Sequence, residues 1–555
     1  MKKTMSPWQR FIGLLQLDRR DIRQILYYAV FAGLVSLSLP LGIQAIINLI
    51  QGAQVSSSWI VLVVLVTLGV AFQGGLQIMQ IRILENIQQK IFTRSSFEFI
   101  YRFPKIKTSE LRNYYPPELA NRFFDTLTVQ KGLSKLLIDF PAAVLQIVFG
   151  ILLLSFYHPF FIIYGLLLIV LIYIVFKFTA HKGLETSLKE SKNKYKVAHW
   201  IQETTRSLIS FKLSGNTSLA MNRNDKLTTE YLDARESHFK ILLLQFIQMV
   251  GFKILVTAGL LVVGGLLVLN QQMNIGQFVA AEIIILLVIT SVEKLIKGLE
   301  TFYDVLTSLE KIGQVVDKEL EPQDGVDPFE NQQNLKIELE NVAYTTNDDF
   351  SILKNINLTI SQSDRIVLGG PSGSGKTTLL KLLSGIIYPT SGTLYVNDAS
   401  IKGIWPNKYR SHIGQVLPEQ QPFEGTLLEN ITFDDPQITR ERVHDVLKNL
   451  GLLSFVKQQA NGLQTMLYPQ GQQMPYTISK RIILARAIIH EPKLLLLKDP
   501  LEHFEPNESA AIIEYLTRPE QPWAIVVASR NPLWLRKASS TLELNEGTLN
   551  HTRNA

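Results

Sequence analysis

The sequence predicts a multi-domain membrane protein, in which an all-α transmembrane domain of six helices precedes a cytoplasmic α/β domain with a phosphate-binding loop. Three observations lead to this fold class. The chain has 555 residues, of which 46% are hydrophobic. Its long apolar runs all lie before residue 300, and short strand-like and helix-like segments alternate after residue 335. A chain of this length exceeds one domain, and its first half is too apolar for a soluble one.

Six apolar runs are long enough to cross a hydrocarbon core of about 30 Å, which takes about 20 helical residues. They lie near residues 24–49, 59–81, 137–156, 160–178, 247–269 and 277–293. An even number of spans places both chain ends on one side of the membrane. The short connectors 51–58, 156–160 and 270–276 contain no Lys or Arg, whereas the N-terminal segment and the long connectors are basic. The positive-inside rule therefore predicts that the two termini and the C-terminal domain are cytoplasmic. The expected location is the cell inner (plasma) membrane.

The net charge and the cysteine content exclude several classes of protein and of site. The net charge of +7 follows largely from this topology, so membrane lipid is an expected partner and nucleic acid is not. The chain contains no Cys, which excludes disulfides, thiolate metal sites and thiol protease activity. The first apolar run begins after about twenty residues and is too long for the core of a cleavable signal peptide.

The domain boundaries follow from composition. Residues 1–20 are expected to form an amphipathic helix on the inner membrane surface. Ser6-Pro7 caps the start of this helix. Its apolar stripe consists of Trp8, Phe11, Ile12 and Leu15, and its opposite face carries Gln9 and Arg10. Residues 21–314 are the six-span domain with long cytoplasmic helical extensions, and residues 315–334 are a polar linker. Residues 335–555 are the α/β domain.

The most specific motif is GPSGSGKT at Gly370–Thr377, which has the GxxxxGK[ST] spacing between an apolar strand and a helix. Glycines let backbone N–H groups approach phosphate oxygens at a helix start. Lys376 would reach the β and γ phosphates, and Thr377 offers a hydroxyl to Mg²⁺. The expected nucleotide-binding residues are Gly370, Ser372, Gly373, Ser374, Gly375, Lys376, Thr377 and Thr378. These features favour a nucleotide-binding domain over a plain glycine-rich turn.

The order of these segments resembles an ABC exporter half-transporter, in which one polypeptide carries a transmembrane and a nucleotide-binding domain. Residues 117–122, PELANR, are similar to the family's GELxxR segment, and residues 423–431, FEGTLLENI, match its FxGTIxENI stretch. Residues 484–487 and 492–497 fix the register of the second domain. The resemblance implies ATP as the cofactor, a homodimer or a heterodimer with a second half-transporter, and an export substrate that the spans do not identify.

In that register, key catalytic positions of the family carry other residues. The LSGGQ signature, which contacts ATP bound to the opposite subunit, falls on residues 474–478, with Tyr476 and Thr477 at both glycine positions. The Walker B acidic pair falls on Lys498 and Asp499. Lys498 puts a positive charge where an anion helps to hold Mg²⁺, so weak Mg²⁺ binding is expected. Asp499, the candidate catalytic carboxylate, is one methylene shorter than the usual Glu, and positioning carries much of phosphoryl-transfer catalysis.

Three further positions differ. The family's Mg²⁺-sensing glutamine, switch histidine and adenine-stacking aromatic align with Pro418, Arg530 and Thr346. Gln415 and Gln420 are out-of-register alternatives for the glutamine, and Tyr344 is expected to be a core residue. The sequence thus predicts an ATP-binding subunit of an export-type ABC transporter with weak or absent hydrolysis. The alternative is a pseudo-ATPase, a non-hydrolysing nucleotide-binding membrane scaffold or regulator.

Overall fold

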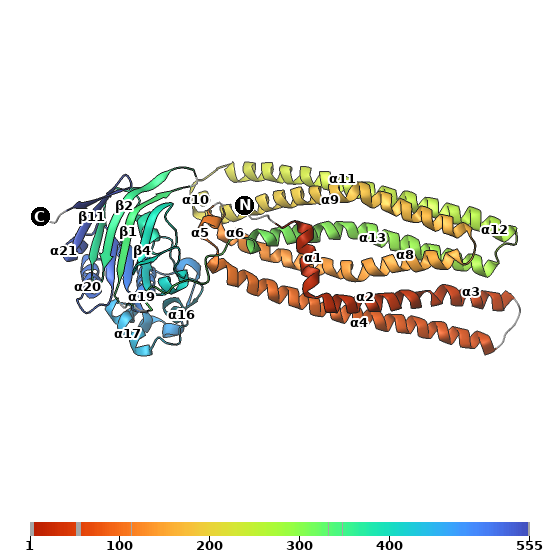
Figure 1. Cartoon of the computed structure of the whole chain (residues 1–555), viewed down its shortest axis with the longest axis horizontal. Coiled ribbons are helices and arrows are strands. Elements are labelled where there is room, and N and C mark those ends of the chain that lie inside the picture. The colour runs from red at the N-terminus through yellow and green to blue at the C-terminus, as the bar shows by residue number, and fades with distance from the viewer. Residues whose placement is uncertain are drawn as a thin grey trace. The chain divides into compact units, whose positions relative to one another are not determined.

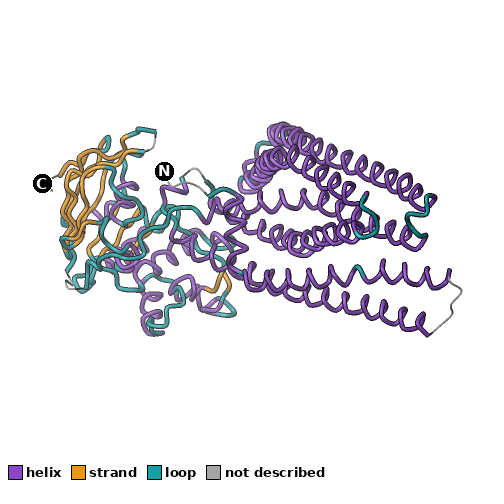
Figure 2. Tube along the Cα trace, turned by 45° about the vertical axis from the view of Figure 1, so that its right-hand side comes forward, coloured by secondary structure: helices purple, strands orange, loops and turns teal. Residues whose placement is uncertain are grey.

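The computed structural model describes residues 5–51, 57–112, 114–330, 332, 334–346 and 348–552. The chain divides into two compact units: Met1–Ile106 with Glu110–Glu319, and Lys107–Ser109 with Leu320–Ala555. We call them unit 1 and unit 2. Unit 1 is built of helices, and unit 2 holds the strands, which are orange in Figure 2.

The long helices of unit 1 lie side by side (Figure 1). The α-helices are α1 (Pro7–Leu17), α2 (Arg19–Ser36), α3 (Ser38–Gln51), α4 (Ser57–Arg102), α5 (Thr108–Leu111), α6 (Pro116–Ala120), α7 (Asp125–Ser134), α8 (Phe140–Ser155), α9 (Phe160–Arg206), α10 (Leu208–Leu213), α11 (Leu219–Gly259), α12 (Gly265–Leu269) and α13 (Ile275–Val316). Helix α5 begins in the short stretch that is grouped with unit 2. Single π-helical turns, Lys135–Asp139 and Leu260–Gly264, precede α8 and α12.

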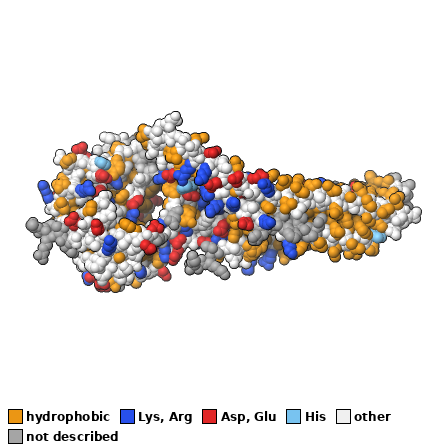
Figure 3. Space-filling view, turned by 90° about the horizontal axis from the view of Figure 1, so that it is seen from above, with side chains coloured by type: hydrophobic (Ala, Val, Ile, Leu, Met, Phe, Trp, Pro, Cys, Tyr) orange, Lys and Arg blue, Asp and Glu red, His pale blue; other side chains and the backbone are white. Residues whose placement is uncertain are grey.

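Five helical stretches within the described residues are long and apolar enough to cross a membrane: Arg19–Gln51, Ser57–Lys105, Pro116–Ser155, Leu219–Leu269 and Ile275–Val316. The remaining predicted run begins α9, where the apolar stretch Phe160–Val170 was found. Hydrophobic side chains cover the helix ends near α3 and α12, and Lys and Arg gather over the opposite end of unit 1 (Figure 3). The expected continuation of membrane helices into long polar extensions is therefore present.

Helix α1 packs its aromatic side chains on α13. The side chain of Ser6 accepts a hydrogen bond from the backbone N–H of Gln9, which completes a capping box at the helix start. The rings of Trp8 and Phe11 have centroids 5.8 and 5.6 Å from that of Phe302. This contact holds α1 against the helical bundle.

The prediction that Arg10 lies on an outer, polar face of α1 is wrong. Its side chain is 10% exposed and forms ion pairs with Asp317 and with Glu310, the latter at 3.5 Å. A buried guanidinium needs such partners, because its desolvation is costly when it is unpaired. Helix α1 thus contacts α13 through charged as well as aromatic side chains.

Unit 2 is an α/β unit. Its strands are β1 (Lys336–Thr345), β2 (Ser351–Ser361), β3 (Arg365–Gly369), β4 (Ser391–Val396), β5 (Ala399–Ser400), β6 (Ile413–Val416), β7 (Gly425–Thr426), β8 (Met466–Leu467), β9 (Leu494–Lys498), β10 (Ala524–Ala528), β11 (Ser540–Asn545) and β12 (Thr548–Thr552). Its helices are α14 (Lys376–Leu383), α15 (Pro406–Ser411), α16 (Leu427–Thr432), α17 (Arg440–Asn449), α18 (Leu453–Gln458), α19 (Tyr476–Ile488), α20 (Pro506–Leu516) and α21 (Pro532–Lys537).

The larger sheet positions the candidate site. Its strand order is β12-β11-β3-β10-β9-β6, and the neighbours from β11 to β6 are parallel. The carboxyl ends of β3, β10 and β9 therefore meet at one edge, where open α/β sheets bind ligands. The residues that follow these strands are the phosphate loop, Ser529-Arg530 and Asp499. Sequence segments more than a hundred residues apart are thereby brought together.

The second sheet, β2-β1-β4-β5, is antiparallel and packs on α14. Tyr344 of β1 is 6% exposed within this core, which confirms the prediction that it is a core residue. The polar segment before β1, from Leu320 onward, is part of unit 2 and packs within it. The buried carboxylate of Glu321 lies 2.7 Å from the guanidinium of Arg410 on α15, and Val326 forms a parallel β-bridge with Ile404.

Candidate functional site

The phosphate loop connects β3 to α14 in a conformation that requires glycine. Gly370 has a φ of +119°, and a Cβ there would lie 2.1 Å from the backbone oxygen of Leu544. Gly375 has a φ of +103°, and a Cβ there would lie 2.8 Å from a methyl carbon of Leu353. Residues with a side chain rarely adopt such φ values. The glycine spacing of the motif is thus needed for the backbone path itself.

Lys376, the first residue of α14, bends back over the loop. Its ammonium donates hydrogen bonds to the backbone oxygens of Gly370 at 2.8 Å and Pro371 at 2.6 Å, and to the hydroxyl of Ser374 at 3.2 Å. Burial lowers the pKa of Lys376, the nearby cations Lys498 and Arg530 lower it further, and Asp499 opposes this. The loop therefore holds a cation at its mouth, where a phosphate group would bind.

A cavity of about 700 Å³ opens beside the loop. Seven of the eight predicted nucleotide-binding residues line it: Gly370, Ser372, Gly373, Gly375, Lys376, Thr377 and Thr378. The eighth, Ser374, is 5% exposed and contacts the Lys376 ammonium instead. The far side of the same cavity is formed by the last residue of β9 and by residues that follow β9 and β10: Lys498, Asp499, Leu501, Glu502, Ser529, Arg530 and Asn531. The sequence-predicted positions thus share one site.

At the end of β9, Lys498 and Asp499 bind each other. The Lys498 ammonium donates a hydrogen bond to the Asp499 carboxylate, and the two side chains are 20% and 35% exposed. The backbone N–H of Asp499 donates to the oxygen of Ala528 at 2.9 Å, which ties this residue to β10. The Asp499 carboxylate, which aligns with the catalytic position of the family, is therefore paired with the Lys498 ammonium.

The cavity suits the phosphates of a nucleotide better than a divalent cation. Lys376, Lys498 and Arg530 contribute positive charge, and such a cluster attracts phosphate oxygens. Magnesium takes carboxylate or hydroxyl oxygens. Here the cavity holds the hydroxyl of Thr377 and two carboxylates, that of Asp499, which pairs with Lys498, and that of Glu502, which accepts a long hydrogen bond from Tyr476. Within the described part of the chain, no group of three or more His, Asp or Glu residues is arranged to hold a metal ion.

A second cavity, of about 330 Å³, adjoins Lys498 and Asp499. It is lined by Pro418, at the family's glutamine position, and by Tyr476, at a glycine position of the signature. The hydroxyl of Tyr476 donates a long hydrogen bond of 3.5 Å to Glu502. The altered signature, glutamine and Walker B positions therefore line the same cavity. The hydroxyl of Tyr476 is hydrogen-bonded to a residue of its own chain, Glu502.

The two alternative glutamines differ in placement. Gln420 lines the second cavity, and its side-chain oxygen accepts a hydrogen bond from the backbone N–H of Leu417 at 2.9 Å. The side-chain oxygen of Gln415 is buried and has no hydrogen-bond partner among the described residues. Gln420 is thus the one that shares a wall with Lys498 and Asp499.

Phe350 is a cavity residue that was not predicted from the sequence. This residue precedes β2, lines the first cavity and is 69% exposed. Thr346, which the register aligned with the family's aromatic, instead closes the turn before Phe350 through its backbone N–H, which donates to the Phe350 oxygen at 2.9 Å. The sequence offered one signal for Phe350. It is an aromatic residue directly before the predicted strand that precedes the phosphate-loop strand.

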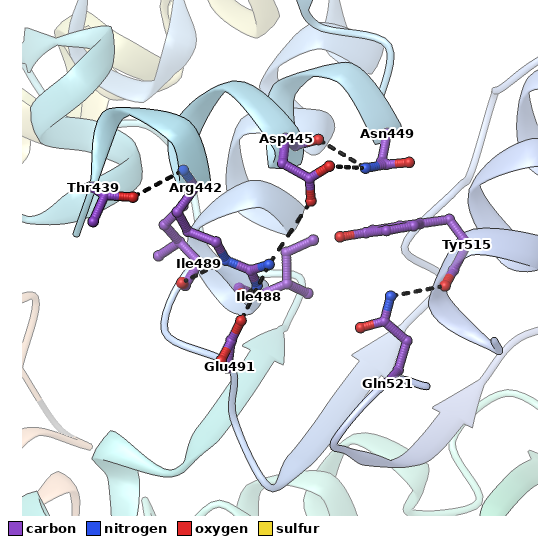
Figure 4. Close-up of polar contacts among 9 residues, drawn as sticks. All are labelled: Thr439, Arg442, Asp445, Asn449, Ile488, Ile489, Glu491, Tyr515 and Gln521. Atoms are coloured by element: carbon purple, nitrogen blue, oxygen red, sulfur yellow. Dashed lines mark hydrogen bonds and ion pairs between the residues drawn. The ribbon is translucent and has the colours of Figure 1, made fainter. Parts of the chain in front are cut away.

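The C-terminal end of α19, the helix that begins at Tyr476, is capped by Arg442. Figure 4 shows the Arg442 guanidinium reaching from α17 to the oxygens of Ile488 and Ile489, with hydrogen bonds of 2.9 and 3.3 Å. Glu491 lies 3.3 Å from the same guanidinium. A cation at a helix C-terminus satisfies free carbonyl groups and complements the helix dipole.

Replacing Arg442 by methionine is expected to destabilise unit 2 by about 1–2 kcal/mol, because the carbonyls at the end of α19 lose a charged donor. Thermal unfolding of the purified chain checks this, with Arg440→Met as the control. Arg440 lies on the same helix and is exposed. Equal unfolding midpoints for the two variants would contradict the capping role.

Two family models match the chain in series. The model described as the ABC transporter transmembrane region matches residues 25–292, and the model described as ABC transporter matches residues 353–502. Together they match most of unit 1 and the central part of unit 2. The expected fold class, a helical transmembrane domain followed by a phosphate-loop α/β domain, is confirmed by these matches and by the structural similarity below.

Several curated proteins are similar. The alpha-hemolysin translocation ATP-binding protein of Escherichia coli O157:H7 is 27% identical over 304 residues, 55% of this chain and 43% of that protein. A putative export ATP-binding/permease protein of Rickettsia bellii is 24% identical over 442 residues, 78% of this chain and 75% of that protein. The exotoxin translocation ATP-binding protein of Pasteurella aerogenes is 25% identical over 360 residues, which are 63% of this chain and 49% of that protein. The chain thus spans less than half of the two toxin-translocation relatives.

A solved structure, a bacterial Atm1-family ABC exporter with ATP bound, superposes with a TM-score of 0.85. It covers 96% of this chain and 94% of its own, with 15% sequence identity. At that identity the similarity establishes the fold.

Proposed function

We propose that this chain, which belongs to the ABC transporter family and has the fused domains of an export-type half-transporter, binds ATP beside Lys376 but hydrolyses it slowly or not at all. The observation that carries this proposal is the ion pair between Lys498 and Asp499 inside the phosphate-loop cavity. The chain would act as the ATP-binding subunit of an exporter for an unidentified substrate.

The residues present support binding more than chemistry. The phosphate loop and its cations would hold the triphosphate through charge-assisted hydrogen bonds. Hydrolysis needs a carboxylate free to orient the attacking water, and the Asp499 carboxylate is bound to Lys498. Mg²⁺, when bound in such a site, neutralises charge between the phosphates. Lys498 would supply a comparable positive charge from the protein itself.

Assembly and location follow from the family and the basic segments. We propose a dimer in the inner (plasma) membrane, with both termini and unit 2 in the cytoplasm. The partner is either a second copy or another half-transporter. The translocation and export names of the relatives support an export direction, whereas the substrate of this chain is not identified by them.

A second candidate function, a non-hydrolysing membrane scaffold or regulator, is favoured by the signature position. Tyr476 replaces a glycine, is hydrogen-bonded to Glu502 of its own chain and lies with its ring 5.6 Å from that of His503. The chain therefore does not offer a partner's nucleotide the glycine amides of the usual signature. Copurification of a second half-transporter with intact motifs would favour the exporter, and a tight homodimer with permanently bound nucleotide would favour the scaffold.

The proposal is tested by ATP turnover of the purified chain in lipid, beside Lys376→Ala, across a range of Mg²⁺ concentrations. Little or no phosphate release, in a preparation that binds ATP, is expected. Turnover that is brisk in the wild type and disappears in Lys376→Ala would show that the altered positions support catalysis.

A further inference from the structure

We propose that Lys480 is a positioning residue of the nucleotide site, whose ammonium takes the place of Lys498 on the Asp499 carboxylate when a bound triphosphate draws Lys498 away. Asp499 then stays paired in the nucleotide-bound chain as well as in the free one. This inference deepens the proposed function and rests on it, because it takes the phosphate loop as the place where the triphosphate is held. Lys480 belongs to α19 and was not predicted as a site residue from the sequence.

Lys498 has two sets of partners that one ammonium cannot satisfy together. It lines the phosphate-loop cavity with Lys376 and Arg530, so phosphate oxygens bound there compete for its hydrogen bonds. It also donates to Asp499, whose carboxylate has no other hydrogen-bond or ion-pair partner among the described residues. Because a triphosphate carries more negative charge than one carboxylate, we expect Lys498 to turn to the phosphates.

An Asp499 carboxylate without a partner would disturb the nucleotide-bound state in two ways. It would repel the phosphates, and since its side chain is only 35% exposed, water would screen that repulsion in part. It would also be free to orient a water molecule for hydrolysis, as a catalytic carboxylate does. A second cation close to Asp499 would prevent both effects.

Lys480 supplies such a cation from the second cavity. Its side chain is half-buried and lines the cavity of about 330 Å³ that Lys498 and Asp499 also line. Its ammonium lies 5.4 Å from the centre of the Tyr476 ring and, among the described residues, forms no hydrogen bond or ion pair. Burial lowers the pKa of Lys480, and the charges of Glu502 and Asp499 oppose this shift. The flexible four-carbon stem of a lysine lets the ammonium move toward a carboxylate.

Of the two carboxylates that line the second cavity, Asp499 is the one that loses its partner. The other, Glu502, accepts a long hydrogen bond from Tyr476 and lies 3.9 Å from the Nε2 atom of His503. Asp499 is paired with Lys498 and gives up that partner when phosphates bind. The unpaired ammonium and the carboxylate that becomes unpaired therefore share one cavity, which makes Asp499 the expected partner of Lys480.

The test is a double-mutant cycle on ATP affinity, measured for the full chain in lipid with Lys480→Met, Asp499→Asn and both changes together. Lys480→Met is expected to weaken ATP binding about fivefold, the scale of one partly exposed ion pair. In the Asp499→Asn background the same change should weaken it less than about twofold, because no carboxylate there needs a partner. Lys480→Arg should retain the wild-type affinity. Lys448→Met is the control, since Lys448 is exposed on α17 and lines neither cavity.

A second measurement follows the amine of Lys480 itself. Acylation by an amine-reactive reagent requires the neutral amine, so a lysine paired with a carboxylate reacts more slowly. We expect saturating ATP to slow the labelling of Lys480 at least about threefold in the wild type and to leave it unchanged in Asp499→Asn, as measured by peptide mass spectrometry. A merely structural lysine would not show this dependence on Asp499. Labelling of Lys448 in the same samples is the internal control.

The outcomes separate this inference from the proposed function. Equal changes of ATP affinity for Lys480→Met in the two backgrounds, whether losses or none, overturn the exchange, because a phosphate contact or a structural role would act without Asp499. A loss that disappears in Glu502→Gln and persists in Asp499→Asn assigns Lys480 to Glu502 and overturns it as well. If Lys376→Ala leaves ATP binding unchanged, the proposed function fails and this inference fails with it. If Lys376→Ala weakens ATP binding and the cycle shows no coupling, this inference alone fails.

Discussion

Replacing Lys376 by alanine is expected to weaken ATP binding by about 30- to 150-fold, because a charge-assisted hydrogen bond to phosphate contributes about 2–3 kcal/mol. The ammonium of Lys376 already lies among the loop oxygens of Gly370 and Pro371. Phosphate oxygens would take up its hydrogen bonds on binding. The measurement is equilibrium binding of ATP to the chain in lipid, at fixed ionic strength.

The matched control for that variant is Lys381→Ala. Lys381 lies on the same helix, α14, and pairs with Glu419 at 2.5 Å. It removes one positive charge from unit 2 without touching the described lining of the cavity. Equal affinities for Lys376→Ala and Lys381→Ala would remove the basis for assigning the phosphate loop as the ATP site.

The second large effect is expected at Lys498. In the wild type, ATP affinity should change by less than about threefold between EDTA and excess Mg²⁺, because Lys498 places a positive charge near the phosphates without the ion. Lys498→Asp exchanges that charge for a carboxylate and leaves Asp499 without its partner. ATP binding by this variant should become dependent on Mg²⁺, with an affinity at least about tenfold weaker in EDTA.

Lys498→Gln separates the two parts of this effect, since it removes the positive charge without adding a metal ligand. Its ATP affinity should be weaker than that of the wild type in EDTA and should recover less in Mg²⁺ than that of Lys498→Asp. If EDTA abolishes ATP binding by the wild-type chain, the idea that the lysine replaces the metal charge is wrong.

Much of the fold follows from local sequence features. Long apolar runs specify membrane helices because backbone polar groups in lipid must be satisfied within the segment. The phosphate loop could also be predicted from the sequence, because the backbone requires glycine at Gly370 and Gly375, which have positive φ values. Strand order then explains why Lys498 and Arg530 reach the loop from distant segments. The membrane helices and the phosphate loop depend on residues close together in the sequence, and the placement of Lys498 and Arg530 depends on the strand order of the parallel sheet.

The features that the sequence did not yield depend on particular tertiary contacts. The burial of Arg10 is set by Asp317 and Glu310, some three hundred residues away. The approach of Phe350 to the cavity depends on the turn that Thr346 closes, and turn residues of this kind fit many conformations. The engagement of Asp499 by Lys498 depends on side-chain geometry at the end of β9. Spacing rules identify such residues without revealing their partners.

The chemical identity of the nucleotide held by the chain shows whether ATP is bound and turned over slowly or not at all. The purified chain in lipid is incubated with ATP and Mg²⁺ for a time that is short beside slow turnover and is then separated from free nucleotide, with Lys376→Ala as the control for nonspecific retention. The bound nucleotide is then released and analysed. Recovery of intact ATP from the wild type alone is the predicted result. Recovery of ADP, with phosphate released in step, would show that the chain hydrolyses ATP efficiently despite Lys498.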